Sequence, residues 1–209
     1  MSDSYKTIKT SSSDEFVEKR SRFIGYAKPV KTEEEAQEFI NKIKKEHWDA
    51  RHNCYAYVLR EGGVKRYSDD GEPQGTAGVP MLDVLTKSGV CDAVVVVTRY
   101  FGGVLLGTGG LVRAYSQGAK IALEASGIVT MSVCAECEIC CSYERYGKLN
   151  TLVLNGGGVV DDTVFADTVK LAFHIPLDLL EALKKNVLDA TSGDTEIDVK
   201  GEKYCEIGE

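Results

Sequence analysis

Two short stretches of this 209-residue chain hold residue types that can bind or activate a small molecule. The first, residues 69–78 (DDGEPQGTAG), places Asp69, Asp70 and Glu72 around Gly71. Carboxylates this close together can raise one another's pKa for acid–base work, or bind a hard cation. Asp and Gly are also common in turns, and the spacing is not that of an EF-hand loop. An ordered turn and a functional site are therefore both open interpretations.

The second stretch, residues 99–115 (RYFGGVLLGTGGLVRAY), joins a predicted strand to a predicted helix and is rich in glycine. Glycines before a helix let backbone N–H groups approach an anion. Arg99 at the strand end and Arg113, expected in the first helical turn, would reach the same anion. The pattern is neither a Walker loop nor a dinucleotide fingerprint. Close packing of the helix on the strand explains the glycines equally well. The candidate anion-binding loop consists of Gly102, Gly103, Gly107, Gly109 and Gly110.

The cysteines are not expected to hold a metal. Four of the seven lie at Cys134, Cys137, Cys140 and Cys141, in a predicted strand over residues 133–142. Side chains alternate between the two faces of a strand, so these thiols cannot close one tetrahedral shell. We expect reduced thiols, with the inward ones acting as small hydrophobes, and no metal or cofactor.

A single histidine near the first stretch is a further candidate. His52 follows Arg51 at the start of a predicted strand, and only a nearby carboxylate or phosphate would make it functional. Trp48, His47 and His174 are interpreted as packing or surface residues. The chain has no local signature of a Ser–His–Asp or Cys–His nucleophile.

The helices and strands that position these residues are predicted from the spacing of apolar residues and from the capping and turn residues between them. Thr32 and Glu35 fit a capping box ahead of an amphipathic helix, and Gly62 lies in a predicted hairpin joint. Residues 1–19 are polar and predict a frayed end or an edge strand. The remaining expected elements of this half are a strand over 21–30, a hairpin of 53–59 and 64–68, a helix over 80–88, a buried strand over 93–98 and a helix over 111–126.

The chain then begins a second pattern near residue 130. Its order is βαββαβ, the ferredoxin-like split βαβ arrangement. We therefore predict an α+β protein with two domains, residues 1–130 and 131–209. The expected elements are strands over 133–142, 158–165, 168–175 and 195–204, with helices over 143–155 and 176–190.

Composition and charge limit the function. The longest apolar run, Ala93–Val97, is too short to span a membrane, and the N-terminus has no secretory signal, so we expect a cytoplasmic protein. Residues 1–130 hold 18 basic and 17 acidic residues, whereas residues 131–209 hold 7 basic and 15 acidic ones. The second domain is therefore a poor candidate for binding phosphate backbones.

Three segments in this order and spacing, HNCYAYV, DDGEPQGTAGVPML and VVVVTRYFGGVLLGTGGLVRAY, strongly resemble the YigZ/IMPACT family. The resemblance covers about residues 20–127, and the βαββαβ tail resembles the small C-terminal domain of the bacterial members. It implies an N-terminal fold shared with a ribosomal-protein domain and with domain IV of elongation factor G. It implies a C-terminal domain similar to the ferredoxin-like domain V of that factor.

The resemblance leaves two functions open. The first is a binding protein that acts in translation or its regulation and contacts RNA, the ribosome or a translation factor through the N-terminal domain. The second is an enzyme or small-ligand binder for a phosphorylated substrate at the glycine-rich loop. The motif positions form one candidate site without assigned roles, namely His52, Asp70, Glu72, Thr76, Arg99 and Arg113.

Overall fold

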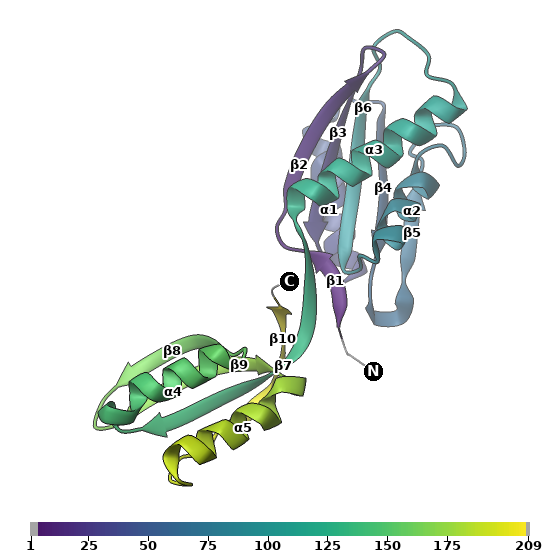
Figure 1. Cartoon of the computed structure of the whole chain (residues 1–209). Coiled ribbons are helices and arrows are strands. Elements are labelled where there is room, and N and C mark those ends of the chain that lie inside the picture. The colour runs from purple at the N-terminus through teal and green to yellow at the C-terminus, as the bar shows by residue number, and fades with distance from the viewer. Residues whose placement is uncertain (1–3, 208–209) are drawn as a thin grey trace. The chain divides into compact units, whose positions relative to one another are not determined.

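The computed structural model describes residues 4–207 of the chain (Figure 1). It divides into two compact units, one formed by Tyr5–Thr130 and the other mainly by the chain from Met131 onward. Strand β7 (Ile128–Cys141) runs through the boundary between them without an intervening loop. The protein is therefore a mixed α+β chain of two units.

The N-terminal unit is built on a five-stranded sheet in which each neighbouring pair of strands is antiparallel. Its order is β2-β3-β6-β4-β5. Strand β2 is the edge strand predicted within residues 1–19, of which residues 1–3 lie outside the described part. A short strand β1 (Tyr5–Ile8), which the sequence did not predict, pairs with β7. The sheet strands are β2 (Ser12–Glu18), β3 (Ser21–Pro29), β4 (His52–Val58), β5 (Lys65–Ser68) and β6 (Ala93–Tyr100).

Helices cover both faces of this sheet. Helix α1 (Glu33–Glu46) packs on one face, and its Thr32 cap accepts a hydrogen bond from the Glu35 N–H at 3.2 Å, as the capping box predicts. Helices α2 (Gly78–Ser88) and α3 (Thr108–Ser126) pack on the other face and form a separate core with it. Figure 1 shows α3 lying across the sheet on the side opposite α1.

Small residues let α3 approach the sheet closely, as their spacing predicts. Ala114, Gly118 and Ala122 are all buried. A Cβ atom at Gly118 would lie 2.9 Å from the side chain of Val97, and one at Gly25 would lie 2.2 Å from the Gly118 carbonyl oxygen. The helix begins at Thr108, three residues before its predicted start.

The loops that carry the candidate site residues lie at one end of the sheet. Because β3 and β4 both run antiparallel to β6, their first residues lie at the same end as the last residues of β6. We call this the loop end. Its segments are the β2–β3 turn at residues 19–20, the α1–β4 connection at 47–51, the loop at 69–77 and the glycine-rich loop at 101–107.

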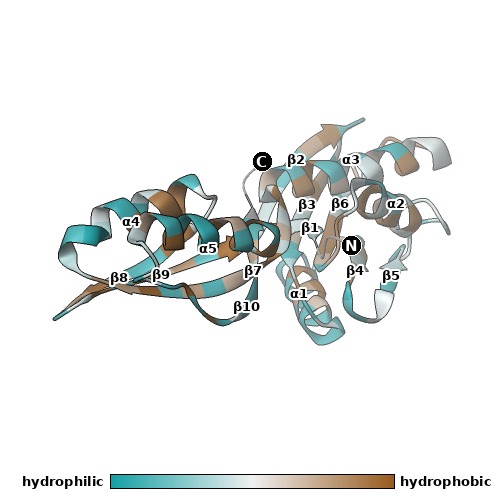
Figure 2. Cartoon of the chain, turned by 60° about the horizontal axis from the view of Figure 1, so that its bottom comes forward, coloured by the Kyte–Doolittle hydropathy of each residue, from teal (hydrophilic) through white to brown (hydrophobic). Residues whose placement is uncertain are grey.

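The second unit follows the predicted βαββαβ order. Strand β10 pairs with β7, which is followed across the sheet by β9 and β8. Figure 2 shows α4 hydrophilic along its first part and more hydrophobic toward its end, and the buried residues of this helix are Leu149 and Val153. The remaining elements are α4 (Tyr143–Asn155), β8 (Val159–Phe165), β9 (Val169–Pro176), α5 (Leu177–Thr191) and β10 (Asp198–Ile207). No helix in the described part of the chain is long and apolar enough to span a membrane.

Candidate functional site

The loop at residues 69–77 is held in place by its own carboxylates. The Asp69 side chain accepts hydrogen bonds from the backbone N–H groups of Gly75 at 2.9 Å, Ala77 at 3.0 Å and Gly78 at 2.8 Å. Two of these groups belong to the start of α2, where a negative charge is favoured. Thr76 is buried and donates its hydroxyl proton to the Pro73 carbonyl oxygen at 2.6 Å. These hydrogen bonds are those of an ordered turn, which is one of the two interpretations of this stretch.

Asp70 and His52 lie together, as their membership of one candidate site predicts, but their side chains do not contact each other. The Asp70 carboxylate accepts from Lys44 Nζ at 2.6 Å and from the backbone N–H of Asn53 at 2.8 Å. The Asp70 carbonyl oxygen lies 3.0 Å from His52 Nδ1. Since a carbonyl only accepts, His52 Nδ1 is the donor of this hydrogen bond.

Glu72 and Arg99 form the buried centre of the cluster. Arg99 Nη1 lies 2.6 Å from Glu72 Oε1, and Tyr115 donates its hydroxyl proton to the same oxygen at 2.8 Å. Burial raises the pKa of the Tyr115 hydroxyl, and the neighbouring Cys54 and Glu72 raise it further, so Tyr115 stays a donor. Arg99 Nη2 also reaches Ser21 Oγ at 3.5 Å, while Nε has no partner within residues 4–207.

Arg99 and Arg113 lie in different environments. The Arg99 guanidinium is buried and its charge is balanced by Glu72. Arg113 is exposed, and it lies in the second turn of α3 rather than in the predicted first turn because the helix starts earlier. It lines a surface groove that Arg99 does not reach. The expected convergence of both cations on one anion is therefore not part of this geometry.

The candidate glycines divide into two kinds. Gly102 is required by close packing, since a Cβ atom there would lie 1.9 Å from the Arg20 carbonyl oxygen, and its N–H donates to Ser21 Oγ at 3.2 Å. Gly103 and Gly107 have positive φ angles of 83° and 73° and open space around them. Gly109 and Gly110 lie in the first turn of α3, whose preceding residue provides no side-chain cap.

The cysteines follow the predicted alternation with one difference. Cys137 and Cys141 are buried in the core of the second unit, and Cys140 is exposed. Cys134 is also buried although it lies on the other face, where its thiol contacts Cys205 of β10. In the part of the chain that the structure describes, no three His, Cys, Asp or Glu side chains are grouped to hold a metal ion.

Four further side chains at the loop end were not selected by sequence reasoning. Arg20, Trp48, Arg51 and Phe101 are exposed, Trp48 to 82%. Neither arginine forms an ion pair within the described residues. Sequence analysis treated Trp48 as packing or surface, and only its place beside Arg51 could have drawn attention to it. We call these four residues the loop-end surface.

Hydrogen bonds and close backbone contacts tie this surface to the rest of the unit. His47 Nδ1 lies 2.9 Å from the Tyr100 hydroxyl, which donates to Asp49 Oδ1 at 2.9 Å. The α1–β4 connection is thereby attached to the end of β6. The β2–β3 turn is attached to the glycine-rich loop through the Gly102 contact with Arg20. Each segment that carries these side chains is therefore held by the end of β6 or by a neighbouring loop.

Comparison with known proteins assigns the family. Residues 19–123 match the Impact N-terminal domain, and residues 139–194 match a domain of unknown function, DUF1949. The chain is 40% identical over 195 residues to IMPACT family member YvyE of Bacillus subtilis, covering 93% of this chain and 90% of that one. The chain belongs to the IMPACT family. It is also 35% identical over 182 residues to family member YigZ of Escherichia coli, covering 86% and 89% of the two chains.

The comparison also includes a solved structure and a longer IMPACT protein. A crystal structure of a hypothetical protein is 32% identical to this chain, with a TM-score of 0.60 over 96% of this chain and 98% of that one. The Protein IMPACT homolog of Dictyostelium discoideum is 40% identical over 95 residues, which are 43% of this chain and 27% of that protein. The match to this longer IMPACT protein therefore covers only part of each chain.

Proposed function

We propose that the protein is a cytoplasmic binding protein that acts in translation or its regulation and contacts RNA through the loop-end surface. The observation that carries this proposal is the placement of two exposed guanidinium groups, Arg20 and Arg51, which form no ion pair within residues 4–207, with the exposed rings of Trp48 and Phe101. Cations interleaved with exposed aromatic rings are the usual composition of a surface that binds single-stranded nucleic acid.

Each component has a definite role in such a contact. A guanidinium group donates several hydrogen bonds in a plane and binds phosphate oxygens in pairs. An exposed ring stacks on a base, which stabilises binding by about 1–3 kcal/mol per base without strong sequence preference. Trp48, at 82% exposure, offers most of its surface to such a base. The surface therefore fits an unpaired RNA strand better than a duplex.

The charge distribution favours the first unit as the contact. Residues 1–130 have nearly balanced charge, whereas residues 131–209 carry 15 acidic residues against 7 basic ones. The second unit repels phosphate, so binding is confined to the first unit and involves few phosphates.

The fold analogies that the family resemblance implies agree with this proposal. We propose that the first unit resembles domain IV of elongation factor G, and that the second is ferredoxin-like and similar to domain V. The strand order β10-β7-β9-β8 with its βαββαβ succession supports the second analogy. Fold similarity alone is a weak argument for function, and the loop-end surface carries the proposal.

The alternative, an enzyme or binder for a phosphorylated small molecule, receives less support from the geometry. Its phosphate site relied on Arg99 together with Arg113. Because Glu72 neutralises Arg99 in the interior, only Arg113 and the helix N-terminus would hold the anion. A single exposed cation binds phosphate weakly in water.

The test is a titration of fluorescein-labelled, 12-nucleotide single-stranded RNA, followed by fluorescence anisotropy at several salt concentrations. With about two phosphates neutralised, the log–log salt slope should be about -1.4. Arg51→Ala should weaken binding and change the slope to about -0.7. Lys65→Ala is the matched control, since Lys65 is exposed on β5 at the opposite end of β4. Absence of RNA binding at low salt, or an equal effect of both variants, would contradict the proposal.

A further inference from the structure

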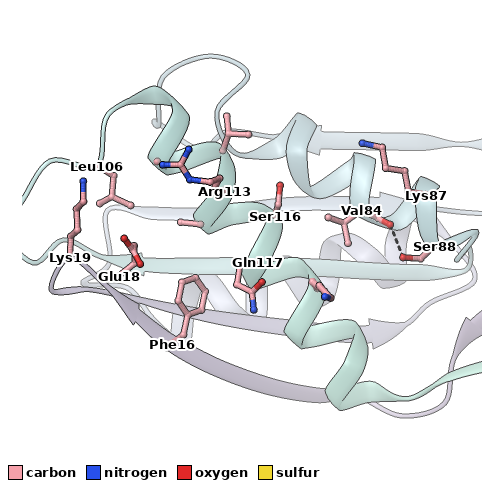
Figure 3. A pocket seen from close by; sticks show the side chains of 14 residues that line it. Phe16, Glu18, Lys19, Val84, Lys87, Ser88, Leu106, Arg113, Ser116 and Gln117 are labelled. Carbon is pink, nitrogen blue, oxygen red and sulfur yellow. Dashed lines mark hydrogen bonds between the residues drawn. The ribbon is translucent and has the colours of Figure 1, made fainter.

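A second surface of the same unit has a different chemistry. A groove of about 740 Å³ runs along α3, and residues of strand β2 and of α2, which lie on the two sides of this helix, complete its lining (Figure 3). The α3 stripe of Gly110, Arg113, Gln117 and Lys120 lines it, preceded by Leu106. These positions are spaced by three or four residues and therefore lie along one side of the helix.

The floor of the groove is apolar. Phe16, Val84, Leu106, Val112 and Ala114 contribute to its lining. Val112 is more than one-third exposed, so the floor is accessible from solvent. Apolar surface of this kind is stabilised when an apolar partner covers it. Apolar side chains of a protein partner offer such groups, whereas a phosphate backbone does not.

The rim of the groove is strongly basic. Lys19, Lys87, Arg113 and Lys120 surround it, and Glu18 is the one carboxylate among its lining residues. Figure 3 shows Arg113 and Lys19 near one end, with Lys87 on the other side.

Most of this positive charge is available to a partner. Arg113 and Lys19 form no ion pair within residues 4–207. Lys87 and Lys120 contact Asp83 and Glu124 of their own helices at 3.6 and 3.7 Å, in exposed pairs that exchange easily with another anion. The rim therefore complements negative charge placed on both flanks of an apolar occupant.

The length of the groove is that of a short helix. From Gly110 to Lys120 the helix α3 rises about 15 Å, which equals nearly three helical turns. A helix laid in a groove anchors itself through apolar side chains at positions i, i+3, i+4 and i+7. Acidic residues beside that stripe would face the basic rim.

We propose that this groove binds an acidic amphipathic helix of a partner protein. The apolar floor provides the buried contact, and the basic rim selects the orientation and accelerates association. The inference goes beyond RNA binding at the loop-end surface and does not depend on it, because it uses different side chains.

The experiment uses a fluorescein-labelled, 15-residue peptide with leucines at helical spacing and glutamates on both flanks, titrated with the full chain. The comparison peptide has the same composition in scrambled order. We expect the patterned peptide to bind at least about tenfold more tightly than the scrambled one. Equal binding would mean that charge alone is recognised and would overturn the proposal.

Charge reversal locates the contact. Arg113→Glu should weaken binding of the patterned peptide at least about tenfold, and a peptide with lysines in place of glutamates should bind this variant better than wild type. Lys31→Glu, an exposed position just before α1, is the matched control and should change affinity less than twofold. Unchanged binding by Arg113→Glu would remove the groove from the interaction.

Two other occupants are distinguished by the same materials. If 12-nucleotide RNA competes with the peptide and Arg113→Glu abolishes RNA binding, the groove is a nucleic-acid surface and the proposal fails. If wild type self-associates in sedimentation velocity and Arg113→Glu is monomeric, a second copy occupies the groove instead. Peptide binding without RNA binding would contradict the proposed function and leave this inference standing.

Discussion

Arg99 and Glu72, which are 27 positions apart in the sequence, form an ion pair with both side chains more than nine-tenths buried and with Nη1 2.6 Å from Oε1. Tyr115 donates to the same carboxylate oxygen. The pair joins the end of β6 to the loop at 69–77, while Tyr115 joins that loop to α3. Two of the motif positions therefore stabilise the loop end from inside.

Glu72→Gln should destabilise the protein strongly. The amide keeps the shape of the side chain but leaves Arg99 as an uncompensated buried charge, which costs about 3–5 kcal/mol of the free energy of unfolding. Urea denaturation measures this loss. The control is Glu15→Gln, which breaks the exposed pair between Glu15 and Arg22 and should cause no measurable change. A loss below about 1 kcal/mol for Glu72→Gln would show that the pair does not stabilise the fold.

Asp69→Ala should loosen the start of α2. The substitution removes the acceptor of three backbone N–H groups, so we expect a loss of about 1–3 kcal/mol in the free energy of unfolding. Asp83→Ala removes an exposed carboxylate from the same helix and should stay within about 0.5 kcal/mol of wild type. Equal stability of the two variants in thermal denaturation would refute the capping role.

Two glycines of the candidate anion loop should respond in opposite directions. Gly102→Ala places a methyl group against the Arg20 carbonyl oxygen, so the backbone must shift at a cost of about 1–3 kcal/mol. Gly109→Ala lies in α3, with its nearest neighbour 3.8 Å away at Arg113 Nη1, and should stabilise the helix by about 0.5–1 kcal/mol. Urea midpoints give both values. If Gly102→Ala has the urea midpoint of wild type, the β2–β3 turn and the glycine-rich loop are not in tight contact.

The thiols should differ in reactivity. Burial raises the pKa of Cys54 far above its usual range and raises that of Cys134 to about 11, whereas Cys140 is exposed. Only the thiolate reacts, so iodoacetamide should label the exposed Cys140 first and leave Cys54 unmodified. Peptide mass spectrometry identifies the sites. Labelling of Cys54 at the rate of Cys140 in the folded protein would contradict its burial.

The raised pKa of Cys54 also predicts how stability depends on pH. The unfolded thiol loses its proton near pH 8.5, while the folded one keeps it. The folded state therefore binds more protons above that pH, and the free energy of unfolding should decrease as the pH rises beyond about 9. Cys54→Ala should reduce this decrease relative to wild type.

Much of the local structure could be predicted from the sequence, because its signals are local. The Thr32 cap, the left-handed Gly89 after α2 and the stop at Gly127 each depend on residues within one turn of the helix they limit. That Cys137, Ile139 and Cys141 lie on the same face of a strand likewise follows from its two-residue period alone.

The candidate site could be predicted only in part, because its partners are distant. Tyr115 is 43 positions from Glu72, and Ser21 is 78 positions from Arg99. No spacing rule joins such residues, so the sequence could nominate Arg99 as an anion ligand but not show that Glu72 already neutralises it. The loop-end surface escaped prediction for the same reason, since Arg20 and Trp48 become neighbours of one sheet end only through strand pairing.

The central claim, that RNA bases stack at the loop end, is tested most directly by the fluorescence of Trp48, the one tryptophan of the chain. Because its ring is 82% exposed, its emission reports directly on stacking. We expect single-stranded RNA to quench this emission in a saturable way, with a midpoint that shifts to higher RNA concentration in Arg51→Ala and stays unchanged in Lys65→Ala. Unaltered Trp48 emission at RNA concentrations where anisotropy shows saturated binding would contradict the claim.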